Sequence, residues 1–93
     1  MSVKETDSLI LYHMQACPYC IKTRRALARL ELDVELRDID QNPLYRQELL
    51  SGGGKTQAPC LRIEESDKTR WLYESDDIID YLTHYKNQLV NAA

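Results

Sequence analysis

The sequence predicts an α/β domain with the element order β-α-β-α-β-β-α and a four-stranded mixed sheet flanked by helices. The first observation is a short apolar strand at residues 9–13, followed by a segment of helical periodicity at 19–32. The second is an alternating strand at residues 34–39, which a right-handed crossover through that helix makes parallel to the first. The third is a polar loop between strands at 61–64 and 71–73, which makes these two strands an antiparallel hairpin.

The composition is typical of one globular domain spanning residues 1–93. The chain is 43% hydrophobic and 29% charged, and its net charge of -3 gives no electrostatic footprint for nucleic-acid binding. The longest apolar run, residues 9–12, is far too short to span a membrane, and the first residues contain no apolar signal-like segment. We therefore expect a cytoplasmic monomer with no membrane or nucleic-acid partner, frayed at residues 1–7 and at about 88–93.

Helix signals define the other elements. Asn42 followed by Pro43 predicts a short helix that runs to about Leu50, and the run at 51–54, Ser-Gly-Gly-Gly, should end it and form a flexible loop. Ser75-Asp76-Asp77 caps a final helix. The apolar stripe of the first helix is Ile21, Ala26, Leu27 and Leu30, and that of the last is Ile78, Ile79, Tyr81, Leu82 and Tyr85, whose tyrosines we assign to the core.

The most informative segment is Cys17-Pro18-Tyr19-Cys20, which places two cysteines one helical turn apart at the start of the first helix. Unpaired backbone N–H groups and the positive end of the helix dipole should point at the Cys17 sulfur and lower its pKa from the usual value of about 8.5. Cys20 falls nearer the interior. This asymmetry predicts a redox-active pair in which Cys17 attacks and Cys20 resolves.

Two other roles of the pair compete with redox exchange. A zinc site would need two further ligands, and the available ones, Cys60, His13 and His84, form no second paired motif. A structural disulfide between residues three apart would close almost no loop and would constrain the unfolded chain little. We therefore expect no metal, and we expect the two histidines to be surface or strand-end residues.

A second notable element is Ala58-Pro59, between the glycine-rich loop and the third strand. A proline in that place is a candidate for a cis peptide bond, although an ordinary trans turn proline has the same sequence. In a chain of this element order, the turn falls beside the cysteine loop. The backbone N–H and C=O of Ala58 would then face an extended thiol peptide.

The CPYC motif at 17–20, Ala58-Pro59 before a strand and the acidic helix start at 75–77 together resemble a dithiol glutaredoxin. The resemblance covers essentially residues 8–86 and implies the thioredoxin fold. It also implies a glutathione-disulfide oxidoreductase of cell redox homeostasis and electron transport, with glutathione as co-substrate. The implied partners are disulfide-containing or glutathionylated proteins.

By this resemblance, the glutathione-binding residues are Tyr19, Lys55, Gln57, Ala58, Pro59, Glu74, Ser75 and Asp76. The family usually has a lysine three residues before the nucleophile, where this chain has Met14, and Lys55 is the candidate to replace its charge. Gln57-Ala58-Pro59 stands where the family usually has Thr-Val-Pro, so that Gln57 offers an amide to a carboxylate.

The segment from Leu72 to Leu82 is similar instead to the N-terminal domain of glutathione transferases, in which an acidic-Ser pair at a helix start holds the γ-glutamyl end of glutathione. The N–H groups of Ser75 and Asp76 suit the γ-glutamyl carboxylate, and a carboxylate of Glu74 or Asp76 suits its ammonium group. A helix cap with acidic residues that complement the dipole would have the same sequence, so both interpretations stay open.

Several functions and roles stay open beside this prediction. The thiol of Cys60 is either a small buried hydrophobe at a strand start or a third thiol near the site. A [2Fe–2S] cluster held by two glutathiones and the Cys17 thiolates of two protomers is one alternative function, and reduction by thioredoxin reductase is another. The basic face of the first helix, expected to be solvated, could steer anionic glutathione or acidic proteins toward Cys17; it consists of Lys22, Arg24, Arg25 and Arg29.

Overall fold

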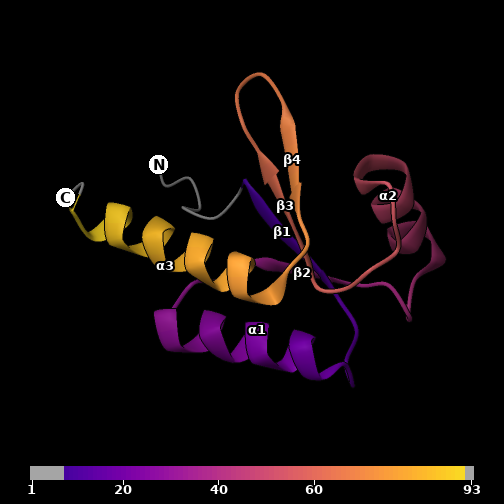
Figure 1. Cartoon of the computed structure of the whole chain (residues 1–93), viewed down its shortest axis with the longest axis horizontal. Helices are drawn as coiled ribbons and strands as arrows, with labels where there is room; N and C mark the ends of the chain where they lie inside the picture. The colour runs from indigo at the N-terminus through magenta and orange to yellow at the C-terminus, as the bar shows by residue number, and fades with distance from the viewer. Residues whose placement is uncertain (1–7, 92–93) are drawn as a thin grey trace.

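A computed structural model describes residues 8–91 as one sheet covered by three helices (Figure 1). The elements, in chain order, are β1 (Leu9–His13), α1 (Pro18–Leu30), β2 (Glu35–Asp38), α2 (Pro43–Gly53), β3 (Cys60–Glu64), β4 (Thr69–Leu72) and α3 (Ser75–Asn91). The predicted order β-α-β-α-β-β-α is confirmed. The predicted fraying of residues 1–7 lies outside the described residues.

The sheet has the strand order β2-β1-β3-β4. β1 pairs in parallel with β2, with Leu11 opposite Leu36, and antiparallel with β3, with Leu11 opposite Leu61. β3 and β4 form the predicted antiparallel hairpin, with Leu61 opposite Leu72. A helical crossover produces the parallel pair, and a short polar loop produces the hairpin, so the sheet is mixed as predicted.

Helices cover both faces of the sheet, and β1 supplies side chains to both cores. Leu9 and Leu11 point to the face where α1 and α3 lie side by side (Figure 1), whereas Ile10 and Tyr12 point to the face covered by α2. Because successive strand side chains alternate in direction, a strand covered on both faces must be apolar throughout. All five residues of β1 are accordingly buried.

β2 departs from the clean alternation that its sequence predicted. Val34 and Ile39, which flank the strand, are buried, but Leu36 in its middle is 44% exposed. β2 is an edge strand, so the helices that cover the centre of the sheet do not extend over Leu36. The sequence pattern identified the strand but not its position at the edge.

The start of α2 was predicted correctly, but its end was not. The Asn42 side chain accepts a hydrogen bond from the Leu44 N–H at 3.0 Å, and Pro43 is the first helical residue. The helix then continues through Gly53 and ends at Gly54, whose φ of 94° is a left-handed conformation that glycine adopts without strain.

The glycines of the last turn of α2 allow this helix to approach the end of β4 closely. A Cβ atom on Gly52 would overlap the Trp71 ring, and a Cβ atom on Gly53 would overlap the Tyr73 hydroxyl. Only residues without a side chain fit in these places. The predicted flexible loop at 51–54 is therefore wrong for residues 51–53, which are packed helix.

α3 is also longer than predicted. It reaches Asn91, whereas fraying was expected from about residue 88. Leu89, in its last turns, packs against the core formed by the sheet, α1 and α3, which explains why the helix continues. Residues 92–93 lie outside the described part. Within residues 8–91, the helices are too short or too polar to cross a membrane.

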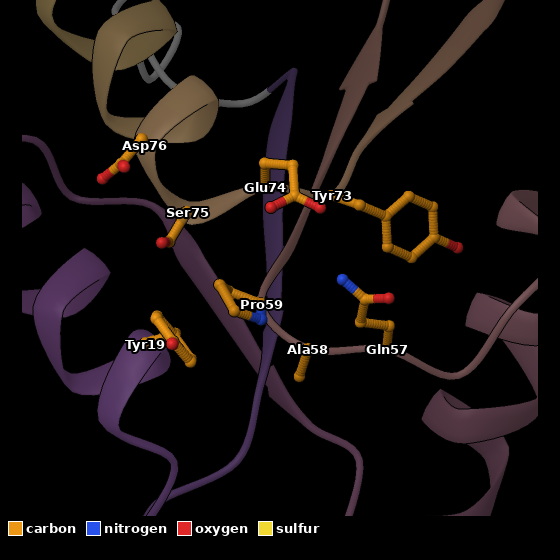
Figure 2. A pocket seen from close by; sticks show the side chains of 8 residues that line it. All are labelled: Tyr19, Gln57, Ala58, Pro59, Tyr73, Glu74, Ser75 and Asp76. Atoms are coloured by element: carbon orange, nitrogen blue, oxygen red, sulfur yellow. The ribbon is translucent and has the colours of Figure 1, made fainter.

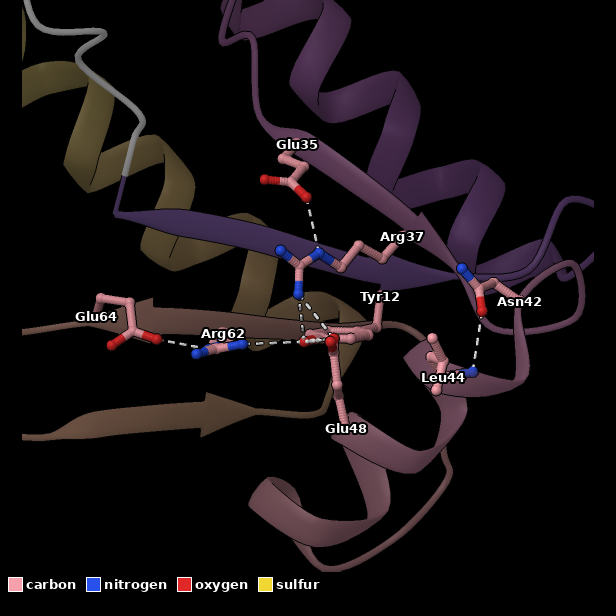
Figure 3. A network of polar contacts seen from close by, with 8 residues as sticks. All are labelled: Tyr12, Glu35, Arg37, Asn42, Leu44, Glu48, Arg62 and Glu64. Carbon is pink, nitrogen blue, oxygen red and sulfur yellow. Dashed lines mark hydrogen bonds and ion pairs between the residues drawn. The ribbon is translucent and has the colours of Figure 1, made fainter.

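A polar network surrounds the buried Tyr12 hydroxyl on the α2 face of the sheet (Figure 3). The hydroxyl donates to Glu48 Oε1 at 2.9 Å and accepts from Arg62 at 3.2 Å and from Arg37 at 3.4 Å. Arg37 also donates to Glu48 Oε1 at 2.7 Å. The carboxylates that bind the two guanidinium groups from their other side are Glu35 and Glu64. These contacts fix α2 to the sheet.

Replacement of Tyr12 by phenylalanine should destabilise the fold by about 1 kcal/mol, because the hydrogen bond to Glu48 is lost while the ring remains packed. Urea unfolding followed by circular dichroism measures this change. Tyr45→Phe, which removes a hydroxyl outside this network, is the control and should leave the midpoint almost unchanged. Equal stabilities of Tyr12→Phe and the wild type would show that the hydrogen bonds of the Tyr12 hydroxyl contribute nothing to the free energy of unfolding.

Candidate active site

The cysteine motif lies at the junction of β1 and α1. Cys17 is the N-cap residue of α1, in extended conformation with φ -72° and ψ 123°, and its carbonyl accepts the first helical hydrogen bond from the Ile21 N–H at 2.9 Å. Pro18 occupies the first helical position, where the lack of an N–H costs nothing. The predicted helix start, at about Tyr19, is therefore one residue late, and the helix ends at Leu30 instead of residue 32.

The environment of Cys17 favours the thiolate form. Partial burial raises the pKa of the Cys17 thiol, but the N–H groups and thiol of the first turn and the positive charge of Arg24 outweigh this effect and lower the pKa below its ordinary value. The thiol forms no capping hydrogen bond of normal geometry, so these N–H groups act on the sulfur mainly as dipoles. The half-buried Cys17 is thus suited to be the nucleophile.

Cys20 has the opposite environment. It is fully buried, and its sulfur accepts a long hydrogen bond of 3.4 Å from the Met14 N–H. Burial, the strongest effect, raises the pKa of Cys20 to about 11, and the neighbouring Cys17 contributes to the increase. A thiol with this pKa stays protonated at neutral pH. The asymmetry predicted for the pair is present in the geometry, with both thiols free in the described structure.

The third cysteine, Cys60, is the first residue of β3 and is completely buried. Burial raises the pKa of Cys60 to about 12, which makes its thiol a poor nucleophile. Of the two predicted roles, this geometry agrees with the small hydrophobe at a strand start.

The predicted cis peptide is confirmed at Ala58-Pro59, and these residues line a pocket beside the start of α1 (Figure 2). The pocket has a volume of about 310 Å³. Tyr19 from α1 stands on one side of it, and the segment just before α3 forms the other. The lining residues are Tyr19, Gln57, Ala58, Pro59, Tyr73, Glu74, Ser75 and Asp76.

The structure brings together most of the predicted contact residues, since all of them except Lys55 line the pocket. Lys55 lies outside the lining but contacts the lining residue Tyr73. Its Nζ sits 4.6 Å from the centre of the Tyr73 ring, and its carbonyl accepts a hydrogen bond from the Tyr73 hydroxyl at 2.9 Å. Tyr73, which also lines the pocket, was missed among the predicted contact residues. Its position directly before the acidic helix start was the available signal.

The start of α3 forms the acidic side of the pocket. The helix begins at Ser75, and the Ile78 N–H donates to the Glu74 carbonyl at 2.8 Å, so the N–H groups of the first turn remain available to an anion. The exposed Asp76 carboxylate forms an ion pair with Lys22 of α1. This pair links the two helices across the outer edge of the pocket.

One of two predicted positions is confirmed and the other needs correction. His13, expected at the surface or a strand end, is the last residue of β1, and at this strand end it is only 2% exposed. Arg24, expected on a solvated helix face, is half-buried and donates to His13 Nδ1 at 2.9 Å. Each residue satisfies the polar groups of the other, which is why both can be buried. His84, by contrast, is exposed as predicted.

No group of three or more His, Cys, Asp and Glu side chains within residues 8–91 is arranged to hold a metal ion. This finding concerns ligands from one chain only.

A family model described as "Glutathione S-transferase, N-terminal domain" matches residues 11–88. The match spans most of the chain. This chain belongs to the glutathione S-transferase N-terminal domain family. A curated glutaredoxin from Pseudomonas aeruginosa is 33% identical over 58 residues, which are 62% of this chain and 69% of that protein. The predicted relationship to both glutaredoxins and transferase N-terminal domains is confirmed.

Solved structures agree with this family membership. A possible glutathione S-transferase from Rhodopseudomonas palustris is 29% identical with a TM-score of 0.65, and the match covers 84% of this chain but only 40% of that protein. Wheat glutaredoxin matches with a TM-score of 0.66 at 14% identity, over 90% of this chain and 84% of that chain, which shows the fold. The transferase N-terminal domain described here thus has the thioredoxin-like fold and spans less than half of that transferase.

Proposed function

We propose that this chain is a glutathione-dependent thiol–disulfide oxidoreductase of the glutaredoxin type. The observation that carries the proposal is the placement of Cys17, whose pKa is lowered, two residues from the pocket-lining Tyr19, with the protonated Cys20 one turn behind it. A low-pKa thiol beside a pocket and a resolving thiol next to it are the groups that disulfide exchange requires. The family and its glutathione-named relatives support glutathione as the co-substrate.

Glutathione is an extended peptide with a carboxylate at each end, and the pocket offers a partner for each part. The Ala58 backbone lies in the pocket wall and would pair with the backbone of the cysteinyl residue. Gln57 would donate its amide to the glycyl carboxylate. Tyr19, which is 63% exposed, would cover the ligand from the α1 side.

The γ-glutamyl end would bind at the start of α3. Its carboxylate suits the N–H groups of Ser75 and Asp76, and its ammonium group suits the carboxylate of Glu74 or Asp76. Asp76 already pairs with an ammonium group, that of Lys22. The ligand would therefore exchange one ammonium partner of Asp76 for another, at little cost, because the existing pair is largely solvent-exposed.

The reaction proceeds by two thiol–disulfide exchanges. The Cys17 thiolate attacks the glutathione sulfur of a mixed disulfide, a bond forms between Cys17 and glutathione, and the protein thiolate leaves and takes up a proton. A second glutathione thiolate then attacks the glutathione sulfur on Cys17, which releases oxidised glutathione and regenerates the Cys17 thiolate. Both electrons that reduce the mixed disulfide come from the glutathione sulfurs, which leave joined as oxidised glutathione.

Protein disulfides require Cys20 as well. Attack by Cys17 gives a mixed disulfide with the protein, and Cys20, after losing its proton, attacks the Cys17 sulfur. The reduced protein leaves, and a Cys17–Cys20 disulfide remains for two glutathiones to reduce. A reducing compartment such as the cytoplasm is the setting that we propose for this cycle.

The ring of Tyr73 provides a test of the pocket. Gly53→Ala would place a methyl group on the Tyr73 hydroxyl and displace this ring, so KM for glutathione should rise by about three- to tenfold. Gly52→Ala is the matched control, because its methyl group meets Trp71, which does not line the pocket. Steady-state kinetics against glutathione concentration measures both variants. Equal KM values in the two variants would exclude Tyr73 from the binding site.

The proposed function is tested by reduction of a small glutathione mixed disulfide by the wild-type chain, with glutathione and glutathione reductase as the coupled system. Turnover that saturates with glutathione is the expected result. A parallel assay supplies thioredoxin reductase and NADPH without glutathione and should show no turnover. Activity only in the second assay would refute the proposal and identify a redoxin of the thioredoxin-reductase type.

A further inference from the structure

We propose that Arg24 is a positioning residue for Cys17: it holds the loop that leads to the nucleophile and supplies the cation that stabilises the thiolate. The inference rests on the proposed function only in taking Cys17 as the attacking thiol. The sequence predicted that Lys55 replaces the cation missing at Met14, whereas the structure places the guanidinium group of Arg24 on this loop.

Arg24 contacts three consecutive residues, the last of β1 and the first two of the loop that follows it. Its Nη1 donates to the His13 Nδ1 at 2.9 Å and to the Met14 carbonyl at 3.2 Å, and its Nη2 donates to the Gln15 carbonyl at 2.9 Å. We call this set of contacts the Arg24 clamp. It connects the second turn of α1 to the chain just before Cys17. A planar guanidinium group with several donors makes such multiple contacts, and a lysine ammonium group cannot reproduce their geometry.

The histidine in the clamp is held in one protonation state. A guanidinium group only donates, so the His13 Nδ1 that it contacts must be the nitrogen without a proton. Burial and the nearby charge of Arg24 lower the pKa of His13, against an opposing effect of Asp38. His13 is therefore neutral at neutral pH, and Arg24 provides the positive charge on this side of the nucleophile.

The two candidate cations act on different thiols. Arg24 lowers the pKa of Cys17, whereas Lys55 acts on the buried Cys60 and has its ammonium group over the Tyr73 ring. The prediction that Lys55 replaces the charge missing at Met14 has no support in this arrangement. Within residues 8–91, the side chains whose electrostatic or hydrogen-bonding effect on Cys17 or His13 is resolved are Cys20, Arg24 and Asp38.

The test measures the rate of Cys17 alkylation by iodoacetamide between pH 4 and pH 9, with the modified cysteine identified by peptide mass. Arg24→Gln should slow alkylation at pH 7 by about three- to tenfold and move the profile to higher pH. Arg25→Gln removes the same charge from the next, exposed residue of α1 and should overlay the wild type. This assay needs no glutathione, so its result is independent of whether the pocket binds that ligand.

Arg24→Lys keeps the positive charge but removes the contacts of the Arg24 clamp. It therefore tests the positioning role even if Arg24→Gln does not fold. It should keep the acidic alkylation profile, because the charge remains, but it should lower the rate of mixed-disulfide turnover, because one ammonium group cannot hold two carbonyls and a ring nitrogen. An Arg24→Gln profile that overlays the wild type, or a shift of equal size in Arg25→Gln, would overturn the proposal. A turnover rate of Arg24→Lys equal to that of the wild type would overturn the positioning role.

Discussion

Cys17→Ser is expected to reduce the turnover of glutathione mixed disulfides by roughly a thousandfold or more, to the rate of the uncatalysed exchange. Serine is a favourable N-cap residue, so its hydroxyl should cap the N-terminus of α1 at least as well as the thiol does. The fold should therefore remain intact while the nucleophile is lost. The coupled assay with glutathione reductase measures the activity, and a thermal melt confirms that the variant is folded.

The control for this substitution is Cys60→Ala, which removes the cysteine that lies outside the CPYC motif. Cys60 is buried and its pKa is raised to about 12, so its loss should leave turnover within about twofold of the wild type. The wild-type rate should also persist at pH values below the ordinary thiol pKa, because the pKa of Cys17 is lowered and the thiolate forms earlier as the pH rises. Substantial activity in Cys17→Ser would mean that another group attacks the disulfide.

Cys20→Ser is expected to separate the two routes of the cycle. Reduction of glutathione mixed disulfides needs only Cys17 and should persist at about the wild-type rate. Reduction of a protein disulfide, such as that of insulin, should fall by roughly a hundredfold, because the intramolecular attack by Cys20 is replaced by a bimolecular attack of glutathione. Insulin precipitation and the coupled assay, run on the same preparation, measure the two activities.

For Cys20, the informative quantity is the difference between the loss of insulin reduction and the loss of mixed-disulfide turnover. A buried cysteine replaced by serine loses stability, and such a loss would reduce both activities together. Cys60→Ser makes the same replacement at another fully buried position and controls for this effect. Equal losses of both activities in Cys20→Ser would show that Cys20 is a structural residue and not the resolving thiol.

The sequence predicted the fold well because its elements carry strong local signals. The strand at residues 9–13, with its apolar run at 9–12, and the Asn42-Pro43 helix start both have a local physical cause, and both were located correctly. The end of α2 was not predictable in this way. Glycines usually end helices, but Gly52 and Gly53 belong to α2, and they must be glycine because Trp71 and Tyr73, far along the chain, occupy the space that a side chain would fill.

In the candidate site, too, the parts with local sequence motifs were predicted, and the parts that depend on contacts between distant residues were not. The cysteine pair and the segments around Ala58 and Ser75 were recognised from motifs, and they line or adjoin one pocket. Lys55 was predicted to contact glutathione but does not line the pocket, since a charge in the sequence says nothing about the direction of its side chain. Arg24 was assigned to solvent, because the helical pattern cannot show that the preceding loop folds back onto it with its carbonyl groups.

The most direct test of the central claim is the identification of the cysteine that forms a disulfide with glutathione. Cys20→Ser, which cannot resolve this adduct internally, would be equilibrated with oxidised glutathione and analysed by intact and peptide mass spectrometry. A single glutathione adduct on Cys17 that reduced glutathione removes is the predicted result. No adduct, or an adduct on Cys60 with Cys17 unmodified, would contradict the assignment of Cys17 as the thiol that exchanges with glutathione.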